Sequence, residues 1–126
     1  MICTATRGGH AEKIDGRPNV RVFINCKTYD VSWNGNIIDI RKADGETNIQ
    51  HQMDGKSILY FRHNDEHVGV DFRHGKPVKA WRRPAEDPHA KYEDYRMVPK
   101  DVKEAALAVF AEMKDALAEA ERKRKL

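Results

Sequence analysis

Turn-forming residues recur about every ten positions through the middle of the chain, and this spacing constrains the fold more than any other feature. The turn pairs are Asn34-Gly35, Asp44-Gly45, Asp54-Gly55, Asn64-Asp65 and His74-Gly75. Such residues accept the positive φ angles that tight hairpin turns require. Because apolar and polar residues alternate between the turns, the pattern predicts an antiparallel β-meander of about six to seven strands over residues 19–83.

The segment after the meander has the pattern of one long helix, about residues 99–124. Pro99 suits the first helical position, and the basic residues near the end complement the helix dipole. Apolar residues three and four positions apart form one stripe along this helix: Val102, Ala106, Val109, Phe110, Met113, Leu117 and Ala120. We therefore expect an α+β fold in which the amphipathic C-terminal helix packs on one face of the sheet.

The turn types predict how the strands pair. We expect two-residue turns at Asn34-Gly35 and Asn64-Asp65, and three-residue loops over residues 53–55 and 73–75 with glycine in the left-handed position. The cross-strand neighbours that follow are Asp30 with Asp39, Leu59 with Val70, Ile49 with Leu59, and Val70 with Val78. These registers place the apolar residues on one continuous face, which the helix should cover.

Trp81 has two predicted positions, depending on the turn before it. A three-residue loop over residues 73–75 directs Trp81 to the face away from the helix. A two-residue turn at His74-Gly75 directs it inward, beside Val68. Local sequence leaves both alternatives open.

The face away from the helix combines cations with aromatic rings. The predicted site residues are Lys56, Tyr60, Arg62, Arg73, Lys79 and Trp81, with Arg82 and Arg83 just beyond the last strand. Cations neutralise phosphates and exposed rings stack on bases, so we expect a non-enzymatic module that binds single-stranded nucleic acid here. Asp30, Asp39 and Asp71 share this face and restrict the positive patch to one side of the sheet.

A protein-interaction module is the alternative hypothesis, such as a small inhibitor or adaptor encoded by a phage or mobile element. It would dock through the sheet face, an edge strand or the outer helix surface, where Leu107 lies off the apolar stripe. The helix is about 40 Å long and a strand about 20 Å, so its overhang could also form a homodimer contact. An enzyme is the third hypothesis.

Candidate catalytic and metal-ligating residues are few. His63 and His67 flank a hairpin turn, so they should project to opposite faces and cannot share an ion. Asp30 opposite Asp39 could form a carboxylate pair for acid and base chemistry, but neighbouring cations are expected to compensate both. The sequence contains no glycine-rich phosphate loop or nucleophile motif, and we predict neither cofactor nor metal.

Composition sets the remaining expectations. With 126 residues, 40% of them hydrophobic and 34% charged, and a net charge of +3, the chain fits a single globular domain without a membrane span. We expect a loose N-terminal arm over residues 1–18, an irregular linker over residues 84–98 and a basic tail after the helix. The arm lacks the apolar core of a secretory signal, which favours a cytoplasmic location, and Cys3 and Cys26 are expected to be free thiols.

Overall fold

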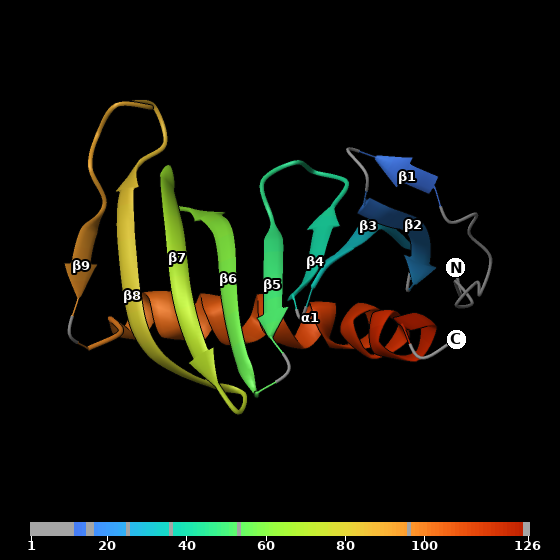
Figure 1. Cartoon of the computed structure of the whole chain (residues 1–126). Coiled ribbons are helices and arrows are strands. Elements are labelled where there is room, and N and C mark those ends of the chain that lie inside the picture. The colour runs from blue at the N-terminus through green and yellow to red at the C-terminus, as the bar shows by residue number, and fades with distance from the viewer. Residues whose placement is uncertain are drawn as a thin grey trace.

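The computed structural model of the chain describes residues 12–14, 17–24, 26–35, 37–52, 54–95 and 97–124. These residues form nine strands in one antiparallel sheet, whose spatial order follows the chain, and one helix that crosses a single face of the sheet (Figure 1). The elements are β1 Glu12–Ile14, β2 Arg17–Ile24, β3 Lys27–Asn34, β4 Ile37–Lys42, β5 Asn48–Gln52, β6 Lys56–His63, β7 Glu66–Arg73, β8 Lys76–Pro84, β9 Glu93–Tyr95 and α1 Lys100–Arg124. The predicted α+β meander with a C-terminal helix is confirmed.

Two short strands extend the sheet beyond the predicted residues 19–83. β1 lies within the predicted N-terminal arm, of which residues 1–11, 15 and 16 lie outside the described residues, and β9 lies within the predicted linker. β9 pairs with β8 only from Ala80 to Arg82. Three-residue strands leave little local pattern, which is why the sequence did not indicate them.

Two hairpin registers are confirmed by the structure. Asn64 and Asp65 adopt φ angles of 50° and 60°, and the two-residue turn between β6 and β7 sets Leu59 opposite Val70. Gly55 adopts a φ angle of 81° in the loop between β5 and β6, which sets Ile49 opposite Leu59. In both hairpins the turn chemistry and the alternation of the strands favour the same pairing.

The β3–β4 turn lies one residue later than predicted, because Asn34 pairs with Ile37. Asp30 therefore faces Arg41, and Asp39 faces Ser32, so the predicted Asp30–Asp39 pair is wrong. Opposite charges directly across two strands stabilise a sheet, whereas like charges destabilise it. The observed register removes the like-charge contact without changing which face either carboxylate occupies.

The predicted three-residue loop between β7 and β8 is wrong. His74 and Gly75 form a two-residue turn with φ angles of 51° and 81°, and Arg73 pairs with Lys76. A β-bulge then shifts the register between Asp71 and Phe72, so that Val70 faces Ala80 rather than Val78. Val78 is the extra residue of the bulge and is 46% exposed.

Helix α1 covers the inner face of the sheet, and its predicted bounds and apolar stripe are confirmed. Phe110 stacks on Phe72 at 4.5 Å between ring centroids. The helix contacts β2, β4, β6 and β8, so it runs across the strands and not along them (Figure 1). Nine strands about 4.8 Å apart nearly match the length of this helix, which removes the overhang on which the homodimer hypothesis rested. The fully buried core residues are Val22, Tyr29, Val31, Ile38, Ile40, Ile49, Leu59, Val68, Val70, Phe72, Ala80, Val102, Ala106, Met113, Ala116 and Ala120.

Ion pairs connect the helix to β3 and β4. The Lys27 and Lys42 ammonium groups both donate to Oε1 of Glu112 on α1, the second at 2.7 Å. Lys27 and then Lys42 lower the pKa of Glu112. These two lysines are therefore structural.

Two further observations concern predictions made from composition. Cys26 is disulfide-bonded, which contradicts its predicted free thiol, and Cys3 lies outside the described residues. Disulfide formation depends on how close two Cβ atoms come in the folded chain, so spacing in sequence does not decide it. No helix in the described part of the chain combines the length and apolar character needed to cross a membrane.

Candidate nucleic-acid interface

Trp81 lies on the outer face of the sheet, which is the face opposite α1. It is the cross-strand partner of Gly69, which in turn faces Tyr60 on β6. A Cβ built on Gly69 would overlap the indole ring, so the ring lies directly over this glycine. The absence of a side chain at position 69 thus leaves room for the Trp81 ring above β7.

Tyr60 completes an aromatic pair with Trp81. Their ring centroids lie 6.1 Å apart with an interplanar angle of 70°, an edge-to-face arrangement. Burial raises the pKa of the Tyr60 phenol, and Tyr92 raises it further, so Tyr60 is neutral at physiological pH. Trp81 and Tyr60, here called the aromatic platform, lie between β6 and β8 on the uncovered face.

Arg83 and Tyr92 border this platform at the end of β8. The Arg83 guanidinium lies 4.9 Å from the centroid of the Tyr92 ring and donates to the Pro88 carbonyl at 2.9 Å. The Nε atom of Arg83 is buried without a hydrogen-bond partner in the described structure. Arg83 belongs to β8, not to the segment after it as predicted, and its charge is partly engaged by the loop before β9.

Four cations gather at the other end of the same three strands, and we call them the basic row: Lys56, Arg73, Lys76 and Lys79. Lys56 faces Arg73, which faces Lys76, so three like charges are direct cross-strand neighbours. Asp71 lies 3.4 Å from Arg73. Within the described residues, Lys56, Lys76 and Lys79 have no ion-pair partner. Adjacent like charges destabilise a sheet, and an anion bound across them would relieve that repulsion.

Two more of the predicted site residues have partners within the protein itself, in addition to Arg73 and Arg83. Arg62 pairs with Glu46 at 3.1 Å and with Asp65 at 3.3 Å. Arg82 does not lie on the outer face, because its cross-strand neighbour on β7 is Val68, which is buried on the inner face.

Arg82 has structural contacts on the helix side of the sheet. Its Nε donates to the Tyr95 hydroxyl at 2.5 Å, and its guanidinium lies 4.7 Å from the centroid of that ring. Glu66 lies 3.5 Å away. The predicted role of Arg82 in an outer-face site is therefore wrong, because extension of β8 to Pro84 turns this side chain inward.

The outer face of β2 to β4 has matched charges. Arg21 pairs with Asp30 at 3.1 Å, and Arg41 pairs with Asp39 at 3.4 Å. The positive patch is therefore restricted to one side of the sheet, as the sequence indicated.

Sequence reasoning missed three residues of the candidate site: Lys76 in the basic row, and Tyr92 and Asp94 beside the platform. Lys76 follows from a two-residue turn at His74-Gly75, because that turn makes it the partner of Arg73. Asp94 is the cross-strand partner of Trp81, through a strand that the sequence did not indicate. Tyr92 has no local signal, since only the folded loop places it against Arg83.

The histidines do not converge on the outer face. His63 faces the helix, 3.7 Å from Asp101, whereas His67 faces outward opposite Arg83, so the two occupy opposite faces. His51 lies on the inner face, 2.7 Å from Ser57 and 3.4 Å from Glu121. Among the described residues, no group of three or more His, Cys, Asp or Glu side chains could hold a metal ion.

Comparison with known protein families, with curated proteins and with solved structures gave no match.

Proposed function

We propose that this protein is a non-enzymatic module that binds single-stranded nucleic acid on the outer face of β6, β7 and β8. The observation that carries the proposal is the aromatic platform beside the basic row: Trp81 lies over Gly69, edge-on to Tyr60, and Lys79 precedes it by two residues on the same strand. Base stacking on such rings contributes roughly 1 to 3 kcal/mol per base. Cations beside the rings supply the contacts to phosphate.

The platform favours single strands over duplexes. A base reaches the face of Trp81 or the edge of Tyr60 only when it has left its own stack, and in a duplex the bases are stacked on one another. Among the described residues, α1 is the single helix and lies on the other side of the sheet, so none of them forms a helix on the uncovered face that would enter a groove (Figure 1). Single-stranded DNA or RNA is therefore the expected ligand class.

The basic row sets the expected salt dependence. Four cations that each neutralise one phosphate would give a slope of log K against log salt of about −3, since each contact with a single strand contributes about −0.7. A slope near zero would mean that the basic row does not bind phosphate.

The test is a fluorescence anisotropy titration of a labelled oligothymidylate of about eight nucleotides, with a matched duplex, at about 50 and 200 mM salt. We expect Trp81→Ala to weaken binding of the single strand by roughly five- to 150-fold, which corresponds to about 1 to 3 kcal/mol. Trp33→Phe is the matched control, because Trp33 packs against the core on the helix side. Tryptophan quenching by the ligand should persist in the control and disappear with Trp81.

Absence of binding at low salt would contradict the proposal, as would equal loss in both tryptophan variants. Salt-insensitive binding of the duplex would also contradict it.

A protein-interaction surface is the second candidate function, and one observation favours it. Trp81, Tyr60, Tyr92 and Arg83 gather on one face, and tryptophan, tyrosine and arginine are the residue types that dominate binding energy at protein interfaces. A protein-docking module would leave oligonucleotide anisotropy unchanged at every salt concentration. The same titration therefore separates the two functions.

A further inference from the structure

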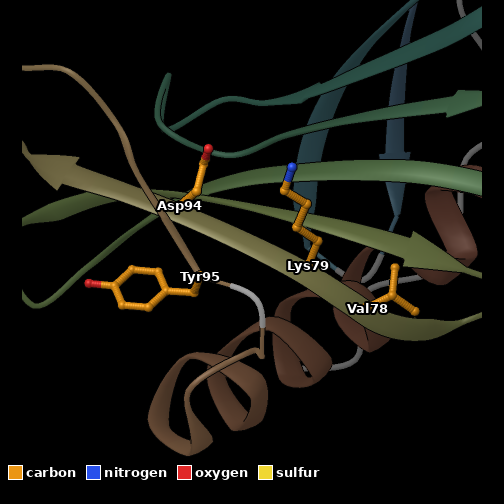
Figure 2. Close-up of a pocket in the computed structure, with 4 residues that line it drawn as sticks. All are labelled: Val78, Lys79, Asp94 and Tyr95. Carbon is orange, nitrogen blue, oxygen red and sulfur yellow. The ribbon is translucent and has the colours of Figure 1, made fainter.

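A pocket of about 440 Å³ opens at the edge of the sheet, where the short β9 ends beside β8 (Figure 2). Val78, Lys79, Asp94 and Tyr95 line it. β9 pairs with β8 only from Ala80 onward, and the bulge at Val78 lies immediately before that residue, so this pocket forms where the pairing stops. Its volume lies within the range of small-molecule sites.

The pocket adjoins the aromatic platform. Asp94 is the direct cross-strand partner of Trp81, and Lys79 lies two residues before Trp81 on the same strand. Both side chains therefore belong to the outer face, and Figure 2 shows them rising from the same side of the ribbon, while Tyr95 and Val78 point elsewhere. A strand with one base on Trp81 would place a neighbouring base within reach of the pocket.

Asp94 differs from the other outer-face aspartates. Asp30, Asp39 and Asp71 each have an arginine within 3.4 Å. Within the described residues, Asp94 has no ion-pair partner. An unpaired carboxylate beside a phosphate-binding surface repels a nucleic-acid backbone, so it weakens binding of every sequence unless the ligand donates hydrogen bonds to it.

We propose that the pocket binds a guanine base of the single strand, with Asp94 as the residue that selects it. The edge of guanine presents the O6 acceptor next to two donors, N1–H and the N2 amino group. Lys79 can donate to O6, and the two oxygens of the Asp94 carboxylate can accept from N1–H and N2. Thymine and uracil offer one N–H between two carbonyl oxygens, so the carboxylate would face an acceptor.

This inference rests on the proposed function, since the strand must first bind to the platform. The other two lining residues, Val78 and Tyr95, point away from Lys79 and Asp94 (Figure 2). The Tyr95 hydroxyl already accepts a hydrogen bond from Arg82, so Lys79 and Asp94 are the charged lining residues left to read the base edge.

The experiment compares three labelled oligonucleotides of about eight nucleotides: all thymidine, one central deoxyguanosine, and one central deoxyinosine, which lacks the N2 amino group. We expect the wild-type protein to bind the guanine strand about five- to tenfold more tightly than the thymidine strand, with inosine between them. Asp94→Asn should abolish the guanine preference while binding of the thymidine strand stays equal or tightens, because a negative charge is removed.

Glu93→Gln is the matched control. It makes the same change of charge one residue away, at an exposed position whose cross-strand partner is the inward-facing Arg82. It should keep the guanine preference. Lys79→Ala should weaken binding of both the guanine and the thymidine oligonucleotide, and it should reduce the ratio of the two affinities.

Three results would overturn the inference: equal wild-type affinity for the guanine and thymidine strands, a guanine preference that survives Asp94→Asn, or its loss in Glu93→Gln. If the thymidine strand binds but guanine adds nothing, only the guanine pocket fails. If no oligonucleotide binds at low salt, the proposed function fails with it.

Discussion

The two halves of the outer face contain similar charged residues, but they differ in how fully carboxylates neutralise the cations. On β2 to β4, Arg21 and Arg41 have carboxylate partners at 3.1 and 3.4 Å. On β6 to β8, Arg73 has a carboxylate partner at 3.4 Å, but Lys56 and Lys76 on either side of it have none within the described residues. The register of the strands therefore decides which surface cations remain available to a ligand.

The inner face supports the same comparison. Lys27 of β3 and Lys42 of β4 both form ion pairs with Glu112, and so they attach the helix to the same half of the sheet, β2 to β4. In that half, cations on both faces serve the fold. The basic row and the aromatic platform occur together in the other half, which is why our proposal places binding there.

Of the substitutions that test this comparison, Gly69→Ala should have the largest effect on stability and on oligonucleotide binding. The Cβ of the new alanine would overlap the Trp81 ring, so the ring would have to move away from β7. We expect destabilisation of about 1 to 3 kcal/mol, the range for overpacking, together with weaker oligonucleotide binding and a shift of the tryptophan emission. Thermal melts and anisotropy measure the two effects, and unchanged binding would show that the position of Trp81 is irrelevant to it.

A pair of double variants tests the two halves directly. Replacing Lys76 and Lys79 by alanine should lower the slope of log K against log salt by about 1.4, since each phosphate contact contributes about 0.7. Replacing Arg21 and Arg41 by alanine removes the same charge from the matched half and should leave the slope unchanged. Equal changes in both variants would mean that net charge, not the basic row, drives binding.

Glu112→Gln should have the smallest effect, confined to stability and dependent on pH. The pKa of Glu112 is lowered when the chain folds, so its contribution is present above its ordinary value of 4.5 and is lost as pH falls through the lowered pKa. We expect the variant to be less stable than wild type by about 0.2 to 1 kcal/mol at neutral pH. Urea melts at neutral and acidic pH should show this difference shrinking in acid, with oligonucleotide binding unaffected.

The predictability of each hairpin depends on how many local alternatives it allows. Asn64 and Asp65 both adopt positive φ, and one register satisfies the alternation on either side, so this hairpin was predictable from its sequence. At His74-Gly75, two loop lengths are compatible with the same residues. The structure combines the shorter turn with a bulge at Val78, and the bulge returns Trp81 to the outer face.

The candidate site was predictable where it depended on alternation and not where it depended on distant contacts. Lys56, Tyr60 and Arg73 share the outer face, as their spacing indicates, whereas Lys79 and Trp81 reach it only because of the bulge in β8. Arg82 was misplaced because β8 continues to Pro84 and Tyr95 binds its guanidinium. Asp94 could not be predicted, since a three-residue strand has no detectable period.

Within a regular strand, the sequence already indicates which residues share a face, because side chains alternate with a period of two. Which residues become cross-strand neighbours on that face, and where a bulge interrupts the alternation, depends on the folded chain. A register offset that leaves both faces unchanged still replaces every cross-strand partner. Asp30 meets Arg41 instead of Asp39 for this reason, and a two-residue turn followed by a bulge places Lys76 beside Arg73 and Trp81 above Gly69. The cross-strand neighbours therefore decide which charges are neutralised and which side chains come together in the proposed binding site.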